Sequence, residues 1–384
     1  MFRRIFCKKE THDELHDCLG NDWSRHYSRL DFIYPSIGKA NLKTVRETFS
    51  PVPLEQIPQL KPTPLVRLKI ASEQTGGKIF LKFEGANPTG SFKDRGSVLT
   101  VEHASRNGYK EIALVTTGSA GVSMSHWAGR KDITTTIYAP ATIPKEKLEK
   151  MLYAGAKVEL RPGTYEELYR QMIDSLHELP KTTFLSSFGT DPYFSEGFTN
   201  IAYEIVEAGV APDLVIAPVG TGASFSAIWR GFKQLHAAGL SPKMPKMIAV
   251  QMNGGPVYEG YKRKKFNCPL ILNNPPHHIA KGLLSREAYD YFRTMNTVRE
   301  SHGDVVGVAE TNIAKDYFKY TITDSAACKH MLEPTSWSVF SALKNIRTDG
   351  KTIVLIGTGN AKNALSAVEE NVPNEYKPFF RLPS

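Results

Sequence analysis

Short apolar runs alternate with amphipathic stretches along most of this chain. The runs have the length of buried strands, and the stretches between them repeat apolar residues at the spacing of a helix. The expected strands are 79–83, 112–115, 134–139, 157–161, 183–186, 213–218, 247–252 and 352–356. The expected helices are 98–105, a stretch ending at 130, 145–153, 165–179, 196–208, 225–238 and 335–346. Because strands that are apolar throughout are covered on both faces, the pattern predicts an α/β fold with two open, mostly parallel twisted sheets covered by helices.

The composition and charge of the chain indicate which kinds of molecule it is expected to bind. A chain of 384 residues with 41% hydrophobic and 23% charged residues is typical of a globular protein with one or two domains. The net charge is +9, but the basic residues are scattered and the longest run is Lys262–Lys265. We therefore expect no nucleic-acid partner and a mild attraction for anionic substrates.

The cysteines and the hydropathy favour a reducing, cytoplasmic setting. The four cysteines, Cys7, Cys18, Cys268 and Cys328, lie far apart and do not form a disulfide framework. The chain has no 18-residue apolar run, so no membrane span is expected. No apolar core follows the basic start of the chain, so no signal peptide is expected.

Residues 1–50 are expected to form an N-terminal extension. Cys7, His12, His16 and Cys18 could surround a metal in principle, but their spacing fits no zinc pattern. A polar helix face is the simpler interpretation, and no metal site is predicted.

One stretch, Asn87–Gly96, carries the most chemistry. It reads Asn-Pro-Thr-Gly-Ser-Phe-Lys-Asp-Arg-Gly and follows the apolar run 79–83. Ser91 is expected to cap a helix, with Asp94 in the acidic first turn. Lys93 then lies in the first turn of a helix at the carboxyl end of a strand, where open α/β sheets keep their ligand sites. A lysine by itself is more often a solvated side chain, whereas a lysine made less basic by its surroundings is a good amine for a Schiff base.

Three further loops follow predicted strands. Residues 116–120 read Thr-Thr-Gly-Ser-Ala, residues 220–224 read Gly-Thr-Gly-Ala-Ser, and residues 357–360 read Gly-Thr-Gly-Asn. Glycines let a backbone approach an anion closely, and the helix that follows offers its N–H groups and dipole. Each loop could also be a simple turn or helix cap.

The lysine stretch resembles the lysine motif of threonine synthases, members of the fold-type-II pyridoxal-phosphate (PLP) enzymes. Similar segments recur in the order of that family from about Pro62 to Asn363. The resemblance implies the PLP fold type II, with a large PLP-binding domain of residues 51–86 and 186–384 and a small domain of residues 87–185. A homodimer in the cytoplasm, with an amino acid as its small-molecule substrate, is also implied.

The resemblance implies roles for particular residues. Lys93 would form the Schiff base with PLP and then move the α-proton, with Phe92 beside it. Cofactor contacts would come from Ser119 near the ring hydroxyl, from Thr358 at the pyridine nitrogen, and from Gly220, Thr221, Gly222, Ala223 and Ser224 around the phosphate. The substrate would be held by Thr116, Thr117, Gly118, Ala120 and Phe194. A neutral hydroxyl at the pyridine nitrogen makes the ring a weaker electron sink, which favours elimination or replacement over transamination.

Some positions differ from the threonine synthase pattern. Phe194 stands where those enzymes carry an arginine for the substrate phosphate, and a ring cannot replace a bidentate cation. Ala120 stands where a threonine is usual, and Ser119 where an asparagine is usual. We therefore keep the enzyme class and leave the substrate open.

Three functions are compatible with this sequence. The default is a PLP-dependent carbon–oxygen lyase or synthase that converts O-phosphohomoserine to threonine by γ- or β-elimination and replacement. The alternative is a β-replacement enzyme that acts on an O-phosphoserine, O-acetylserine or cysteine-type substrate, as cysteate and cysteine synthases do, in a specialised biosynthetic pathway. A protein that binds PLP without turnover is disfavoured because Lys93, Thr358 and the phosphate loop are all present.

Overall fold

The fold is described from a computed structural model. The described residues are 2–4, 30–32, 38–53, 57, 60–187, 191–267, 269–272, 279–283 and 285–377. The cysteines and histidines of the extension, and Cys268, lie outside them. Within the extension, β1 (Phe2–Arg4) pairs antiparallel with β2 (Leu30–Phe32), and α2 spans Leu42–Phe49.

The larger sheet has six strands in the order β11-β10-β9-β12-β4-β3. The strands are β3 (Leu65–Arg67), β4 (Lys78–Phe83), β9 (Leu214–Pro218), β10 (Lys246–Met252), β11 (Asp304–Val308) and β12 (Thr352–Gly357). All neighbours are parallel except β3, an antiparallel edge strand on β4. The parallel strands are almost wholly apolar, as strands covered on both faces must be.

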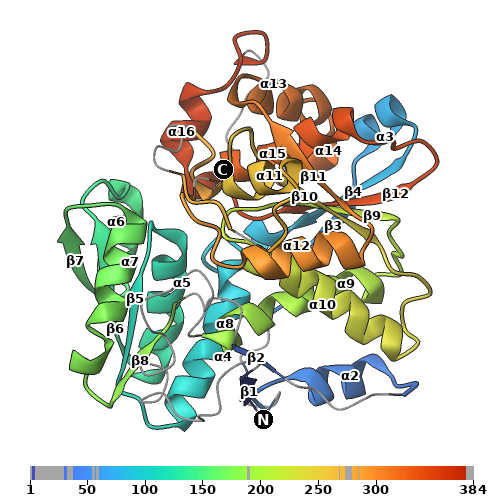
Figure 1. The fold of residues 1–384 in the computed structure, drawn as a ribbon. Coiled ribbons are helices and arrows are strands. Elements are labelled where there is room, and N and C mark those ends of the chain that lie inside the picture. Colours follow the sequence, from blue (N-terminus) through green and yellow to red (C-terminus); the bar gives the residue numbers. More distant parts are fainter. Residues whose placement is uncertain are drawn as a thin grey trace. The chain divides into compact units, whose positions relative to one another are not determined.

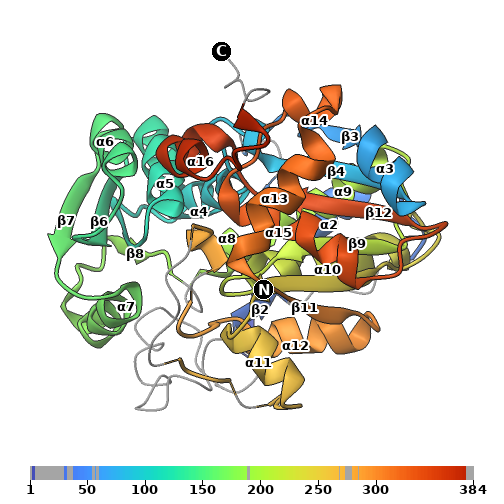
Figure 2. The same ribbon diagram turned by 90° about the horizontal axis from the view of Figure 1, so that it is seen from above.

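Helices lie on both faces of this sheet, with α9, α10 and α12 along one face and α13 and α15 along the other (Figure 1). These helices are α9 (Asn200–Glu207), α10 (Ala223–Ala237), α12 (Tyr291–Glu300), α13 (Glu310–Thr321) and α15 (Pro334–Ala342). The shorter helices can be located in the turned view (Figure 2). They are α3 (Lys69–Thr75), α11 (Pro256–Lys262), α14 (Ser325–Cys328) and α16 (Leu365–Glu370).

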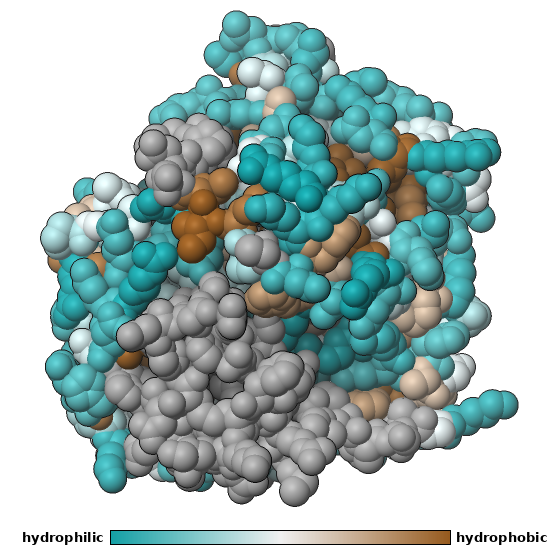
Figure 3. All heavy atoms as spheres, in the orientation of Figure 1, coloured by the Kyte–Doolittle hydropathy of each residue, from teal (hydrophilic) through white to brown (hydrophobic). Residues whose placement is uncertain are grey.

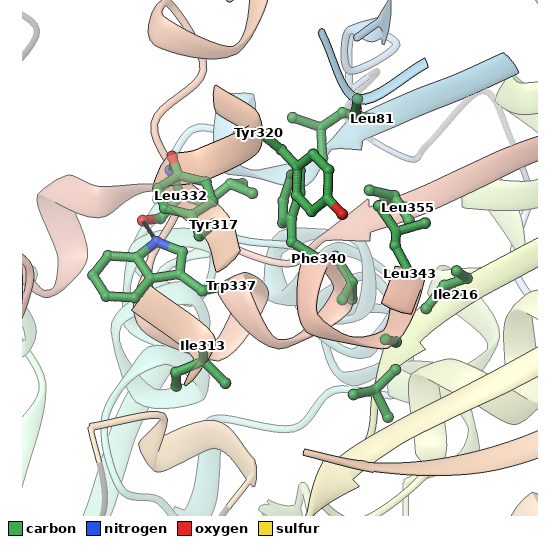
Figure 4. Packing of buried hydrophobic residues seen from close by; sticks show 14 of the residues in the cluster. Leu81, Ile216, Ile313, Tyr317, Tyr320, Leu332, Trp337, Phe340, Leu343 and Leu355 are labelled. Atoms are coloured by element: carbon green, nitrogen blue, oxygen red, sulfur yellow. Dashed lines mark hydrogen bonds between the residues drawn. The ribbon is translucent and has the colours of Figure 1, made fainter. Parts of the chain in front are cut away.

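Aromatic side chains fill the space between the sheet and α13 and α15. Trp337 and Tyr317 stack with ring centroids 5.2 Å apart, and the Trp337 indole donates to the Leu332 carbonyl (Figure 4). Phe340 and Leu355 belong to the same buried cluster. This core holds the parallel strands, and therefore the loops at their carboxyl ends, in fixed positions.

The smaller sheet has four parallel strands in the order β7-β6-β5-β8. The strands are β5 (Glu111–Val115), β6 (Thr134–Pro140), β7 (Lys157–Arg161) and β8 (Thr183–Leu185). Its helices are α4 (Lys93–Arg106), α5 (Ser119–Ala128), α6 (Lys145–Tyr153), α7 (Tyr165–Asp174) and the short α8 (Pro192–Glu196). Helix α7 begins with a complete capping box, in which the Thr164 and Glu167 side chains each bond the other's backbone N–H.

The predicted α/β class with two mostly parallel sheets is confirmed. Three expected helices are shorter or broken: the helix of 165–179 ends at Asp174, that of 335–346 ends at Ala342, and residues 196–208 do not form one helix. Helix α8 ends at Glu196, a 3-10 turn covers Gly197–Thr199, and α9 begins at Asn200. Strand β11 and helices α12 and α13 were not expected from the sequence pattern.

The described residues form two compact units. One contains residues 43–60 and 93–198, and the other contains residues 38–42, 61–92 and 199 onward. The chain therefore passes between the units after Leu42, Leu60, Phe92 and Phe198. The expected domain boundaries at 86/87 and 185/186 stay a prediction.

Hydrophilic side chains cover much of the described surface in Figure 3, with hydrophobic ones gathered in small patches. Within the described part of the chain, no helix is both long and apolar enough to cross a membrane.

Candidate active site

Three neighbouring strands of the larger sheet end at the expected site loops. Strands β9, β12 and β4 lie side by side in that order and run parallel. Residues 220–224 follow β9, Thr358 follows β12, and the lysine stretch follows β4. Because parallel strands place their carboxyl ends at one edge, these loops share that edge of the sheet.

The loop 220–224 presents a row of N–H groups that have no partner within the described part of the chain. Its carbonyls are turned into the protein: Gln251 Nε2 lies 3.5 Å from the Gly220 carbonyl, Asp290 N donates to Thr221 O at 2.8 Å, and Ser226 N donates to Gly222 O at 3.1 Å. The N–H groups of residues 220 to 224, in contrast, find no hydrogen-bond partner among the described residues. Helix α10 begins at Ala223, so its dipole adds positive potential at the same point. This is the arrangement that binds phosphate or another anion.

Two positions of this loop, 220 and 222, require glycine. Gly222 has φ of 104°, in the left-handed region, and a Cβ there would lie 2.0 Å from Thr294 Oγ1. A Cβ on Gly220 would lie 2.4 Å from the Gly282 carbonyl oxygen. Both contacts would force the backbone to move, so any side chain here would distort the N–H row.

Thr358 is held by two neighbours, the buried Ser336 and the half-buried Glu333. Its hydroxyl lies 2.8 Å from Ser336 Oγ and 3.2 Å from Glu333 Oε1. Ser336 Oγ also accepts from Thr358 N, and in the bond between the two hydroxyls either one can be the donor. When Ser336 is the donor, the single Thr358 proton is available to Glu333 or to a ligand. The Thr358 carbonyl accepts from Phe92 N at 3.0 Å, which fixes the residue before Lys93 against this loop.

Lys93 is the first residue of α4 and is half-buried. Its amine lies 5.6 Å from the centroid of the Phe194 ring and 5.8 Å from that of Phe198, within the range of cation–π attraction. The two rings meet edge to face with centroids 5.3 Å apart. The lysine therefore faces two aromatic rings, Phe194 and Phe198, which together form an aromatic wall.

The expected cap at Ser91 is wrong. Helix α4 begins two residues later, and Ser91 Oγ is buried without a partner among the described residues. Asn87 Oδ1, in the same stretch, is also buried and has no hydrogen-bond partner among the described residues. Asp94 instead turns inward, where its Oδ1 accepts from Ser123 Oγ at 2.6 Å and from Trp127 Nε1 at 3.0 Å.

Helix α8 carries Phe194 and is clamped to α4. Asp191 caps α8 by accepting from Phe194 N at 3.0 Å, and its other oxygen accepts from the Thr100 and Ser186 hydroxyls, each at 2.6 Å. Burial raises the pKa of Asp191 to about 6, although these hydrogen bonds act in the opposite direction. A Cβ on Gly197 would lie 2.0 Å from the Arg95 carbonyl oxygen, so the two segments touch through backbone.

The loop 116–120 begins a second helix, α5. The Thr116 hydroxyl accepts from Gly118 N at 2.9 Å, and Gly118 has φ of 141°. The N–H groups of Thr117, Ser119 and Ala120 find no hydrogen-bond partner among the described residues, so this loop can also receive an anion. Sequence reasoning missed Lys147, whose Cδ would lie 2.2 Å from a Cβ on Gly118. It brings a cationic side chain over the loop from α6.

The structure thus places Phe92 against Thr358, and Lys93 beside Phe194. It adds Glu333, Ser336 and Phe198, to which the sequence reasoning gave no role. Glu333 belongs to a Glu-Pro-Thr-Ser segment that resembles a landmark of the family, and this resemblance was the available signal.

Comparisons with known proteins agree with this geometry. The family model described as "Pyridoxal-phosphate dependent enzyme" matches residues 57–359. A threonine synthase from Mycobacterium bovis is 28% identical over 322 residues, which cover 81% of this chain and 84% of that protein. A threonine synthase from Methanocaldococcus jannaschii is 28% identical over 328 residues, or 82% of this chain and 78% of that protein.

A solved structure shares the fold. The diaminopropionate ammonia lyase from Escherichia coli matches with a TM-score of 0.71 and 15% identity, over 91% of this chain and 95% of that one.

Proposed function

Because the chain belongs to the family of pyridoxal-phosphate dependent enzymes, we propose that it carries out elimination and replacement at the β or γ carbon of an amino acid. The default reaction is that of the threonine synthases it is similar to, from O-phosphohomoserine to threonine. The observation that carries this proposal is the row of unpaired N–H groups in residues 220–224, on the sheet edge where the lysine stretch begins.

The donors present suit the cofactor. A phosphate ester needs several converging N–H donors and no carboxylate, and the loop 220–224 with the start of α10 supplies them. A pyridine nitrogen needs one donor or acceptor, and the Thr358 hydroxyl supplies either. When bound, PLP withdraws electrons from the carbons of the attached amino acid, which makes its α-proton removable.

We assign the following tasks to the residues of this chain. Lys93 Nζ carries the cofactor and, once freed, takes the α-proton and returns it. Residues 220 to 224 hold the phosphate, and Ser119 and Thr358 orient the ring. Residues 116 to 118 and Ala120 bind the substrate carboxylate through N–H groups and hydroxyls, with Phe194 beside the substrate side chain. Glu333 is assigned to hold the Thr358 hydroxyl, as a positioning residue.

The aromatic wall favours a second candidate reaction. Phe194 and Phe198 offer the substrate an apolar surface next to Lys93, whereas a departing phosphate needs cations. A β-replacement on an O-phosphoserine, O-acetylserine or cysteine-type substrate, with a small or weakly charged leaving group, fits this surface.

Phosphate release distinguishes the two reactions. The purified, PLP-loaded protein is offered O-phosphohomoserine and, separately, O-phosphoserine. Release from the first with formation of threonine supports the default reaction. Release only from the second supports the alternative. An absence of turnover with every amino acid, while PLP is bound, would instead support a binding protein without catalysis.

Attachment of the cofactor tests Lys93 directly. Borohydride reduction followed by peptide mass spectrometry should locate PLP on Lys93, and Lys93→Ala should lose both attachment and turnover. Lys145→Ala is a matched control, because the Lys145 side chain is 87% exposed on α6. Full activity of Lys93→Ala would overturn the assignment.

We also propose a homodimer that works in the cytoplasm. The resemblance to fold-type-II enzymes supports the dimer, and the widely spaced cysteines support a reducing compartment. Light scattering of the purified protein and fractionation of the source cells test these two points.

A further inference from the structure

The hydroxyl of Thr294 is buried against Gly222 of the loop 220–224. Thr294 belongs to α12 and is 0% exposed, and its Oγ1 has no hydrogen-bond partner among the described residues. This oxygen lies against Gly222, only 2.0 Å from where a Cβ on that glycine would stand.

The surrounding backbone holds this hydroxyl in place. Asp290 N donates to the Thr221 carbonyl at 2.8 Å, and Thr294 N donates to the Asp290 carbonyl at 2.8 Å. The start of α12 is therefore fastened to the loop. The Thr294 hydroxyl is thereby kept against Gly222.

An unpaired buried hydroxyl is costly, because it has lost its bonds to water and gained none in return. Such groups are rare in folded proteins, and one beside a loop with unpaired N–H groups points to a ligand that completes both. The N–H row and the hydroxyl are independent observations, since they come from different segments of the chain.

We propose that the Thr294 hydroxyl is a further donor to the anion that residues 220–224 bind. This inference rests on the proposed function, in which the anion is the phosphate of PLP. Gly222 is then required for two reasons, because it permits the turn and leaves room for the hydroxyl beside the loop.

Affinity for PLP should depend on this hydroxyl. A hydrogen bond to a charged oxygen corresponds to roughly a 10- to 100-fold change in affinity. The change should be confined to ligands that carry the phosphate, because pyridoxal offers nothing for this group to bind.

The experiment is a titration of the cofactor-free full-length protein with PLP and with pyridoxal, followed by absorbance. Thr294→Ala should bind PLP roughly 10- to 100-fold more weakly and pyridoxal as well as the unchanged protein does. Thr294→Ser restores the hydroxyl alone and should recover most of the affinity for PLP. Thr297→Ala, a buried threonine on the same helix, is the matched control and should leave both affinities unchanged.

Other outcomes would overturn the inference. Equal PLP binding by Thr294→Ala and Thr294→Ser, or an equal loss for PLP and pyridoxal, would mean that the hydroxyl does not serve the phosphate. If Thr294→Ala fails to fold, Thr294→Val keeps the shape and takes its place. The ³¹P signal of bound PLP should then shift in Thr294→Val and not in Thr297→Ala.

The test also separates this inference from the proposed function. If the unchanged protein prefers PLP to pyridoxal and attaches it at Lys93, while Thr294→Ala behaves like the unchanged protein, only the inference fails. If the unchanged protein shows no preference for PLP, the proposed function fails as well.

Discussion

At the scale of single residues, Phe194 decides what can stand beside the lysine. Phe194→Arg would place a guanidinium where the ring now faces Lys93 Nζ at 5.6 Å. Because charge-assisted hydrogen bonds to phosphate correspond to about 1.5–3 kcal/mol, we expect kcat/KM for O-phosphohomoserine to rise roughly tenfold or more. Steady-state measurements of phosphate release give this kcat/KM.

The matched control is Phe194→Leu, which keeps an apolar side chain and adds no cation. It should not raise turnover of phosphorylated substrates. If Phe194→Arg has no more effect than Phe194→Leu, this residue does not face the departing group.

Sequence reasoning finds residues in contiguous motifs and misses their spatial neighbours. The loops at 116–120, 220–224 and 357–360 are visible because glycines and hydroxyls follow apolar runs. Thr294 and Glu333 are not visible in this way, because each reaches its loop from a helix start elsewhere in the chain. Their contacts depend on how α12 and α15 pack onto the sheet, which no local pattern encodes.

At the scale of elements, the contact between α4 and α8 decides where Phe194 lies. A Cβ on Gly197 would meet the Arg95 carbonyl oxygen at 2.0 Å, and a backbone atom cannot rotate away as a flexible side chain can. We therefore expect Gly197→Ala to destabilise the protein by about 1–3 kcal/mol or more and to lower turnover. Thermal unfolding and steady-state kinetics measure these effects.

Gly129→Ala is the control for that substitution. Gly129 is helical, and its nearest neighbour, the Ala154 carbonyl oxygen, would lie 3.5 Å from an added Cβ, which is an ordinary contact. Equal stability of the two variants would mean that α8 can move away from α4 at little cost.

The cap of α8 should make stability depend on pH. Burial raises the pKa of Asp191 to about 6, so the folded chain binds this proton more tightly than the unfolded chain, whose value is near 3.8. The resulting stabilisation is complete below pH 3.8 and is lost as the pH rises through 6, up to roughly 3 kcal/mol. The stability of the unchanged protein relative to Asp191→Asn should therefore fall between pH 4 and about 7, as thermal unfolding at several pH values would measure.

Asp213 provides a control of opposite sign. Burial raises its pKa, but the hydrogen bonds from Lys243 and Thr352 outweigh that effect and lower it. The stability of the unchanged protein relative to Asp213→Asn should consequently rise with pH. If the stability difference between the unchanged protein and the variant changed with pH in the same direction for Asp191→Asn and Asp213→Asn, the Asp191 carboxyl would not be the source of the effect.

The elements themselves were largely predictable, and the exceptions have physical reasons. Helix 145–153 and strand 157–161 have the bounds that their patterns predict. The expected helix 196–208 breaks because Gly197 must pass close to the backbone of α4, a tertiary demand. Strand β11 was missed because its run is only Asp-Val-Val-Gly-Val and gains its stability from pairing with β10.

At the scale of the whole molecule, one unit is assembled from three separate stretches of chain, the short one being residues 38–42. Residues 61–92 and 199 onward are joined by buried polar contacts, among them the ion pair of Lys82 and Glu204. Thr63 N also donates to Glu204 Oε2 at 3.0 Å. The same unit contains both the N–H row and Thr358, so ligand binding there should stabilise the folded state of the chain.

Removal of PLP should accordingly lower thermal stability. A ligand that binds only the folded chain stabilises it by about 2.7 kcal/mol at a hundredfold excess over its dissociation constant, which corresponds to a midpoint shift of a few degrees. Pyridoxal, which has no phosphate for the N–H row, should shift the midpoint less at the same concentration. Differential scanning fluorimetry of the cofactor-free protein with each ligand measures both shifts. Equal shifts, or none, would mean that the unpaired N–H groups of residues 220–224 are not the phosphate site, whatever reaction the protein catalyses.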